Sequence, residues 1–157
     1  HRRVLAETLA SPVDLPPFNN SAMDGYALIA ADTTGATEAA PARLTVRDDA
    51  RAGAPAETVL HSGDAIRIAT GAMMPAGADA ALRVEDAVRD GDHLLVSAAL
   101  TPGTDVRPAG DDLRSGATVL ERGTGLRPGG PAMPASSPSR PPPARATARP
   151  CPVVKTA

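Results

Sequence analysis

Hydrophobic and polar residues alternate in several short stretches of this chain, with the period of two that is typical of a half-buried β-strand. In residues 65–69, for example, Ile66 and Ile68 fall on one face. Glycine, proline and aspartate residues separate the stretches and mark turns between them. We therefore predict a mainly β lobe with a curled, barrel-like sheet, whose strands lie in residues 27–30, 43–47, 65–69, 80–85 and 93–96.

Helical patterns are missing from the same region. Between residues 28 and 126 no segment combines helical periodicity with a capping residue at each end, and prolines recur throughout. An apolar-polar pattern at residues 2–9 starts without a cap, as though a preceding element were missing. The chain has no apolar run of about 18 residues and no secretory signal, so we expect a cytoplasmic protein with no membrane contact.

The composition changes abruptly after residue 126. All 18 acidic residues precede residue 127, whereas residues 127–157 hold nine of the 17 prolines, five of the 16 basic residues and the single cysteine, Cys151. Such a segment has too few apolar side chains to offset the entropy lost on ordering, so we predict a disordered tail. Its composition fits a linker, a proline-rich ligand, or GC-rich DNA translated out of frame. We therefore divide the chain into residues 1–126 and residues 127–157.

The only two aromatic residues of the chain, Phe18 and Tyr26, flank a polar cluster that two prolines precede. An aromatic ring buries about 150–250 Å², so this stretch is the expected apolar anchor of the lobe. Asp24-Gly25 is a turn pair in which the glycine tolerates a positive φ. Asp24 could cap this turn with its own carboxylate or could act on a ligand. The polar residues of the cluster are Asn19, Asn20, Ser21 and Asp24.

A second candidate site lies where the strand at residues 65–69 ends, at Thr70 and Gly71. A hydroxyl group and neighbouring backbone N–H groups at a strand end can form a concave site for an anion such as phosphate. The alternative is that Thr70 is an ordinary turn residue.

Two acidic pairs complete the candidates. Asp111 and Asp112 follow a glycine and could cap a turn, repel each other into solvent, or hold a hard cation through oxygen atoms. Glu85 and Asp86 belong to a charge run that is typical of a solvated face, so we interpret them as structural. The three histidines are too scattered to be metal ligands, and no basic stripe with aromatic residues predicts a nucleic-acid partner.

These motifs resemble, in order and approximate spacing, the signatures of the molybdopterin molybdenumtransferases, the family of MoeA and of the gephyrin E-domain. The resemblance covers residues 3–126 and only the N-terminal part of the family. In the third motif Asp111 stands where the family usually has Glu. The sequences that carry the resemblance are PPFNNSAMDGYA at residues 16–27, RIATGAMMPAGAD at residues 67–79 and VRPAGDDLRSG at residues 106–116.

The resemblance implies a role in molybdenum cofactor biosynthesis, namely insertion of molybdate into adenylylated molybdopterin with release of AMP. It implies that the catalytic residues are Asp24, Thr70 and Asp112. It further implies that Asn20, Ser21 and Gly71 bind substrate. Asp24 and Asp112 would hold a divalent metal, Mg²⁺.

The resemblance also implies architecture and partners. The fold it implies is a β-rich lobe joined to part of a small mixed α/β linking domain. The assembly is a homodimer whose active site is shared between subunits, with other molybdenum-cofactor enzymes as further partners. The family's large α/β domain does not follow residue 126 here, so we expect this chain to look truncated and to be inactive alone.

Two other hypotheses remain open at this point. The lobe could be a non-catalytic dimerisation or interaction module. Alternatively, the chain could be the non-functional product of a disrupted gene, with a frameshift near residue 127. Sequencing the coding DNA at that position would distinguish the second hypothesis, because one inserted or deleted base would restore the family's continuation.

Overall fold

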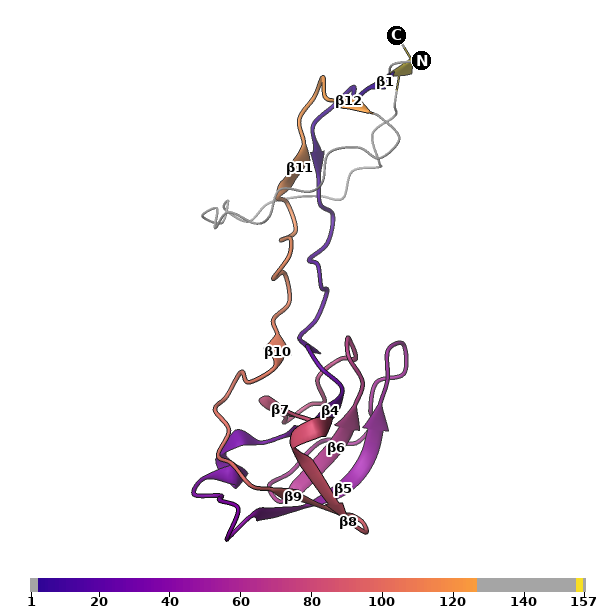
Figure 1. Cartoon of the computed structure of the whole chain (residues 1–157). Helices are drawn as coiled ribbons and strands as arrows, with labels where there is room; N and C mark the ends of the chain where they lie inside the picture. The colour runs from indigo at the N-terminus through magenta and orange to yellow at the C-terminus, as the bar shows by residue number, and fades with distance from the viewer. Residues whose placement is uncertain (1–2, 127–154, 157) are drawn as a thin grey trace. The chain divides into compact units, whose positions relative to one another are not determined.

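The computed structural model describes residues 3–126 and 155–156, and the chain divides into two compact units (Figure 1). The ladder unit consists of His1–Pro17 and Gly110–Ala157, and the sheet unit of Phe18–Ala109. The prediction of a mainly β fold is confirmed, because the described residues form strands and only short 3-10 helices. In this described part, no helix is long and apolar enough to cross a membrane.

A curled six-stranded sheet forms the sheet unit (Figure 1). Its strands follow one another in space in the order β7-β4-β6-β5-β9-β8. Neighbouring strands are antiparallel except for β5 and β6, which run parallel. The strands are β4 (Gly25–Leu28), β5 (Ala42–Ala50), β6 (Asp64–Ile68), β7 (Ala80–Arg83), β8 (Ala87–Asp90) and β9 (His93–Val96).

The five predicted strands are all present, the fifth with the predicted bounds at His93–Val96 and the other four with shifted ends. The first lies at Gly25–Leu28 instead of residues 27–30, because Ala30–Thr33 forms the 3-10 helix η1. The fourth ends at Arg83, where the 3-10 helix η2 (Val84–Asp86) begins. The second extends to Ala50, beyond the predicted residues 43–47, through an irregularity between Val46 and Asp48. The alternation predicted no strand at β8, of which no residue is buried.

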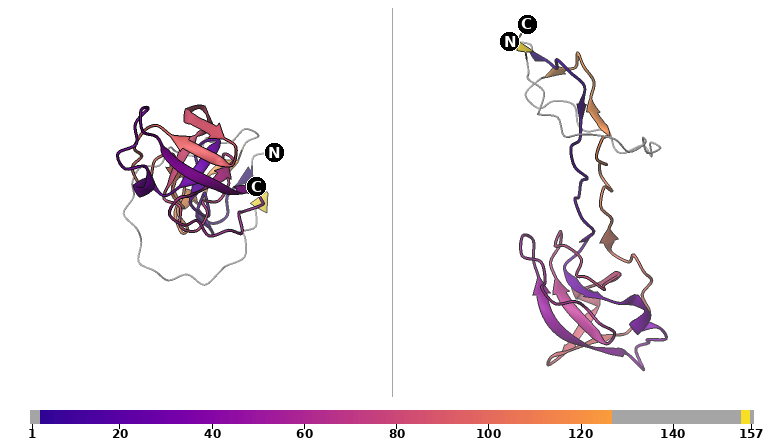
Figure 2. Two further views of the ribbon diagram at one scale, coloured as in Figure 1. Left: turned by 90° about the horizontal axis from the view of Figure 1, so that it is seen from below. Right: turned by 180° about the vertical axis from the view of Figure 1, so that it is seen from behind.

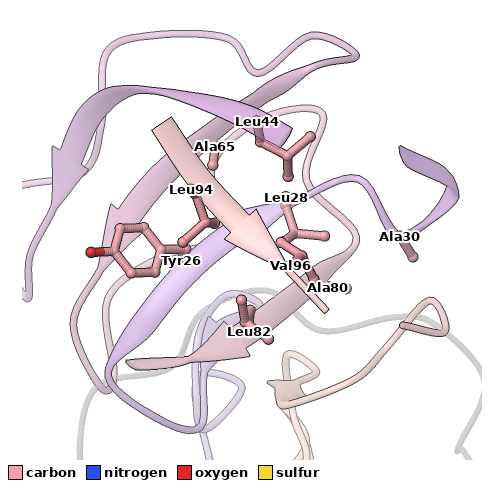
Figure 3. Packing of buried hydrophobic residues seen from close by; sticks show 9 residues of the cluster. All are labelled: Tyr26, Leu28, Ala30, Leu44, Ala65, Ala80, Leu82, Leu94 and Val96. Atoms are coloured by element: carbon pink, nitrogen blue, oxygen red, sulfur yellow. The ribbon is translucent and has the colours of Figure 1, made fainter. Parts of the chain in front are cut away.

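Apolar side chains cover both faces of the sheet. One cluster gathers Tyr26, Leu28, Leu44, Leu94 and Val96 with smaller neighbours, and Figure 3 shows the aliphatic side chains grouped together with the Tyr26 ring at one side of the group. The second cluster lies on the other face, where Ala27 packs with residues such as Ile66 and Ile68. Because β4 contributes to both clusters, all four of its residues are buried, as is typical of a central strand.

Gly25 is required for a reason that the sequence did not reveal. We expected a turn glycine with a positive φ, but Gly25 is the first residue of β4 and is not among the glycines with positive φ. A Cβ atom at this position would collide with the backbone carbonyl oxygen of Leu82 in β7. Gly25 therefore allows the backbones of β4 and β7 to approach each other.

In the ladder unit, two segments of the chain run antiparallel and touch at short pairings (Figure 2). The alternating pattern at residues 2–9 falls on two strands, β1 (Arg3–Val4) and β2 (Leu9–Ala10). Strand β1 pairs with β12 (Gly125–Leu126), and β2 pairs with β11 (Thr118–Leu120). An isolated bridge joins Leu15 to Leu113.

The predicted disordered tail, residues 127–157, lies outside the described residues except at β13 (Lys155–Thr156). This strand pairs antiparallel with β1. At these two residues the structure has a strand where the composition predicted disorder.

Candidate functional site

The carboxylate of Asp24 and the side chain of Thr70 meet at one end of the sheet. Oδ1 of Asp24 accepts hydrogen bonds from the backbone N–H of Thr70 at 2.6 Å and from its hydroxyl at 2.7 Å. Strand register explains the meeting: β4 and β6 are antiparallel, and Gly25 lies opposite Ile68. The residue before β4 and the loop after β6 therefore come together. The structure thus joins two candidates that were predicted from separate motifs.

These hydrogen bonds bear on the interpretation that Asp24 caps its own turn, whereas an action on a ligand stays a prediction. Both come from a residue 46 positions further along the chain, so the interpretation that Asp24 caps its own turn is wrong. The backbone N–H of Thr70, then its hydroxyl, and then the positive charge of Arg67 lower the pKa of Asp24 below its ordinary value. The carboxylate is therefore a solvent-exposed, oriented anion at neutral pH.

The loops that carry Asp24 and Thr70 are tied together by their backbones. The N–H of Gly71 donates to the carbonyl of Ser21 at 2.9 Å, and the N–H of Ser21 donates to the carbonyl of Ala72 at 3.0 Å. Gly71 has a φ of 76°, which lets the chain turn directly after Thr70. The hydroxyl of Ser21 donates to the carbonyl of Met23 at 2.6 Å. In this structure Ser21 and Gly71 fix the shape of the site.

Asn20 is enclosed beside this connection. It belongs to β3 (Asn20–Ser21), which pairs with β10 (Val106–Arg107), and it is only 6% exposed. Its side-chain oxygen is buried and has no hydrogen-bond partner among the described residues. A buried acceptor of this kind carries a desolvation cost until a donor reaches it. Direct substrate binding by Asn20 and Ser21, which is 1% exposed, stays a prediction.

Asp112, the third predicted catalytic residue, belongs to the ladder unit and is described within that unit alone. Its backbone N–H donates to the carbonyl of Leu15 at 2.9 Å, which places it in the turn beside the Leu15–Leu113 bridge. The structure brings Asp24 and Thr70 together, and it does not bring Asp112 into the same unit. The paired acids Glu85 and Asp86 lie in η2, which has no buried residue. After the Asp105 carboxylate, which has the larger effect, their negative charges help to raise the pKa of Arg83.

The donor atoms of this site suit a hard cation that takes few protein ligands. Within the described residues, no group of three or more His, Cys, Asp or Glu side chains could hold a metal ion. Mg²⁺ commonly takes only one or two carboxylates, with water and substrate phosphate oxygens completing its shell. Asp24 offers one oriented, ionised carboxylate, so its chemistry fits such a cation as a single protein ligand.

Arg67 is a further charged residue near the site that we did not select from the sequence. It lies opposite Tyr26 in the pairing of β4 with β6, and its side chain is exposed. After the two hydrogen bonds from Thr70, its positive charge also lowers the pKa of Asp24. The sequence could have indicated Arg67 by its position, because it lies three residues before Thr70 on the strand that leads to the site.

Comparison with known proteins places this chain in a family. Residues 1–137 match the family described as the MoeA N-terminal region (domain I and II). The chain is 40% identical over 127 residues to a molybdopterin molybdenumtransferase of Synechococcus elongatus, which covers 80% of this chain and 32% of the relative. It is 42% identical over 120 residues to molybdopterin molybdenumtransferase 2 of Mycobacterium tuberculosis, covering 76% of this chain and 30% of the relative.

A solved structure shares the fold. The crystal structure of the molybdopterin biosynthesis MoeA protein from Pyrococcus horikoshii matches with a TM-score of 0.77 and 41% identity, over 81% of this chain and 34% of that protein. The chain therefore spans about a third of the length of the proteins that it matches.

Proposed function

The chain belongs to the family of the MoeA N-terminal region (domain I and II), and we propose that it supplies part of the active site of a molybdopterin molybdenumtransferase. The reaction we propose is insertion of molybdate into adenylylated molybdopterin with release of AMP. The observation that carries this proposal is the pair of hydrogen bonds from Thr70 to the Asp24 carboxylate. They hold an ionised, exposed group in a fixed orientation at one end of the sheet.

Asp24 and Thr70 have separate roles in this proposal. The Asp24 carboxylate stays charged because Thr70 stabilises its anionic form, so it can orient a cationic or hydrogen-bond-donating group of the substrate complex. The Thr70 hydroxyl donates a hydrogen bond to Asp24, and the lone pairs on its Oγ1 atom remain available as acceptors. Thr70 can therefore accept a hydrogen bond from a water molecule or from a protonated oxygen of the substrate.

Mg²⁺, when bound, would neutralise negative charge on phosphate oxygens during cleavage of the adenylyl bond. Asp24 and Asp112 are the residues that we propose to hold it. Mg²⁺ usually takes only one or two protein carboxylates, so this proposal needs no further acidic residue of the chain.

We further propose that the complete site needs residues beyond this chain. The chain spans about a third of its relatives, and in the proposed homodimer the missing part comes from a large α/β domain of the other subunit. Asp24, Thr70 and Asp112 then supply only part of the catalytic groups. Purified residues 1–157 should not release AMP from adenylylated molybdopterin in the presence of molybdate, and measurable turnover would contradict the shared site.

The test of the proposed role of Asp24 is the substitution Asp24→Asn in a full-length chimera that joins residues 1–126 to the remainder of a relative. Asparagine keeps the shape and can accept both hydrogen bonds from Thr70, but it removes the charge. We expect the stability to stay within about 0.5 kcal/mol. The single-turnover rate of AMP release should fall at least about 100-fold, the scale of losing one well-placed electrostatic group.

A matched control is Asp48→Asn in the same chimera. Asp48 is a carboxylate of the sheet unit whose pKa is lowered by a backbone hydrogen bond from Asp49, so it shares the electrostatic character of Asp24 without contacting Thr70. Its replacement should leave the rate unchanged. An unchanged rate in Asp24→Asn as well would return Asp24 to a purely structural role.

A further inference from the structure

Asp105 has an uncommon backbone conformation. It is the one residue other than glycine, within the described ranges, that has a positive φ, at 51°. This left-handed region is unfavourable for L-residues, and only Asn and Asp enter it with some frequency. A residue that stays in such a conformation is held there by its surroundings.

An ion pair holds Asp105 in place. Arg83 Nε donates to Asp105 Oδ2 at 2.9 Å and Nη2 donates to Oδ1 at 3.1 Å. Two parallel hydrogen bonds of this kind fix both the distance and the relative orientation of the two side chains. The Asp105 side chain is only 19% exposed, so the pair is partly shielded from solvent.

Both members of this ion pair are attached to the segment that carries Asp24. The backbone carbonyl of Asp105 accepts a hydrogen bond from the N–H of Ala22 at 2.8 Å. On the other side, Arg83 lies opposite Gly25, and the N–H of the next residue, Val84, donates to the carbonyl of Asp24 at 2.9 Å. Backbone hydrogen bonds therefore hold the main chain at Ala22 and at Asp24.

We propose that Arg83 and Asp105 are positioning residues that keep the segment of residues 22–24 in the conformation in which the Asp24 carboxylate meets Thr70. Without the ion pair, the tie at Ala22 depends on a strained residue with no side-chain anchor. The segment then moves away from Thr70 for part of the time. The catalytic consequence rests on the function proposed above, whereas the geometric consequence does not.

The variant Asp105→Asn separates positioning from a simple charge effect, because the two act on Asp24 in opposite directions. Asparagine tolerates a positive φ, so the backbone conformation remains accessible. Removing the negative charge of Asp105 through its field alone would favour the ionised form of Asp24 and lower its pKa. Loosening the hydrogen bonds from Thr70 would instead raise that pKa. The other charges near the segment, Arg67, Arg83, Glu85 and Asp86, are unchanged.

The measurement is an NMR titration of the Asp24 side-chain carboxyl carbon in the 157-residue chain, together with hydrogen exchange of the Thr70 amide. We expect Asp105→Asn to move the Asp24 midpoint upward and to accelerate exchange at Thr70 about two- to fivefold, the equilibrium effect of losing one partly exposed ion pair. Amides of the pairing between β4 and β6 should keep their exchange rates. An unchanged or lowered midpoint with unchanged exchange at Thr70 would overturn the proposal.

The matched control is Asp64→Asn, which breaks the ion pair between Asp64 and Arg47. That pair has the same Arg Nε contact, at 2.8 Å, and similar exposure, 55% for Arg47 and 15% for Asp64 against 50% and 19% for Arg83 and Asp105. Asp64 begins β6, and Thr70 follows the opposite end of that strand. Asp64→Asn should leave both readouts unchanged, and an equal effect there would also overturn the proposal.

A second variant, Arg83→Gln, protects the test against a folding defect in Asp105→Asn. It leaves the strained residue intact and removes the other half of the pair, so faster exchange at Thr70 is again expected, and its absence would count against the proposal. In the full-length chimera, either variant should slow AMP release if the proposed function holds. If Asp24→Asn has no effect there, the proposed function fails while the NMR result still decides the positioning role.

Discussion

The sheet unit and the ladder unit are both assembled from paired extended segments, but they enclose very different amounts of apolar surface. In the sheet unit Leu28, Ile66 and Leu94 are 0% exposed. In the ladder unit Val13 is 51% exposed and Leu15 is 41% exposed. Because apolar burial is the dominant favourable contribution to folding, the sheet unit gains stability from its core. The ladder unit depends much more on backbone hydrogen bonds and local side-chain contacts.

This difference bears on how each unit places its candidate site residue. In the sheet unit, Asp24 is placed by the register of β4 against β6, and that register is fixed because a shift of one residue would turn the apolar side chains out of the core. In the ladder unit, Asp112 is placed by a turn that is closed through backbone hydrogen bonds to Leu15. A candidate site residue on the sheet is therefore held in place by the whole core, whereas one on the ladder is held by its own turn.

The largest expected effect is that of Gly25→Ala. The new Cβ atom would meet the backbone oxygen of Leu82, which cannot move without separating β7 from β4. We expect a loss of at least about 4 kcal/mol or no folded sheet unit, because such a large effect is characteristic of a backbone clash in a core. Chemical denaturation followed by circular dichroism would measure it.

The control is Gly125→Ala in the ladder unit, where nothing lies within 4 Å of the position that a Cβ atom would occupy. This variant should differ from the parent chain by less than about 0.5 kcal/mol. If the two alanine variants were equally stable, the close approach of β4 and β7 would not constrain the fold.

An intermediate effect is expected for Leu94→Ala. Leu94 is fully buried in the cluster of Figure 3, and its truncation should cost about 2–5 kcal/mol through lost burial and the remaining cavity. The matched change in the ladder unit, Val13→Ala, removes an exposed side chain and should cost less than about 0.5 kcal/mol. Comparable losses in urea denaturation would contradict the contrast between the units.

The smallest expected effect is a decline in the stability of the sheet unit in acid. Asp24, Asp48 and Asp105 have pKa values below the ordinary 3.8, chiefly because of the Thr70 amide, the Asp49 amide and the Arg83 side chain, respectively. A carboxyl group whose pKa is lowered by folding contributes stability that is complete above its unfolded pKa and is lost as the pH falls through its folded pKa. The free energy of unfolding should therefore decrease below about pH 4.

Urea denaturation of the 157-residue chain between about pH 5 and about pH 2.5 would measure this decline. The triple variant Asp24→Asn, Asp48→Asn, Asp105→Asn should show a flatter dependence over the same range. An identical slope in the parent chain and the triple variant would show that these three carboxyl groups do not contribute.

The sequence predicted strands well where one face is apolar and the other polar. Ile66 and Ile68 revealed β6 in this way, and the resemblance to a known family singled out Asp24 and Thr70. Strand β8 escaped prediction because its residues are intermediate or exposed, so no apolar face is visible in its four residues. The sequence also did not predict the full length of β5, because the irregularity between Val46 and Asp48 breaks the alternation.

Contacts between distant parts of the chain were the least predictable. The collision that makes Gly25 necessary involves a strand more than fifty residues away, and the pairing of β4 with both β6 and β7 is a property of the fold. The ion pair between Asp105, which lies in a turn, and Arg83 of β7 likewise joins residues 22 positions apart. Local sequence patterns do not reveal these contacts, because the contacts form only when distant strands pair.

The chain passes between the two units twice, and within each unit the residues at these two crossing points are joined by a hydrogen bond. This has a consequence for how the protein can change in evolution. Within the sheet unit, the N–H of Ala109 donates to Oδ1 of Asn19 at 2.9 Å. Within the ladder unit, the N–H of Gly110 donates to the carbonyl of Pro16 at 2.9 Å. The sheet unit is therefore an insertion that starts and finishes at adjoining points, as is common for tolerated domain insertions. Loops of this insertion away from Asp24 and Thr70 can therefore change in length while the ladder unit keeps its own hydrogen bonds.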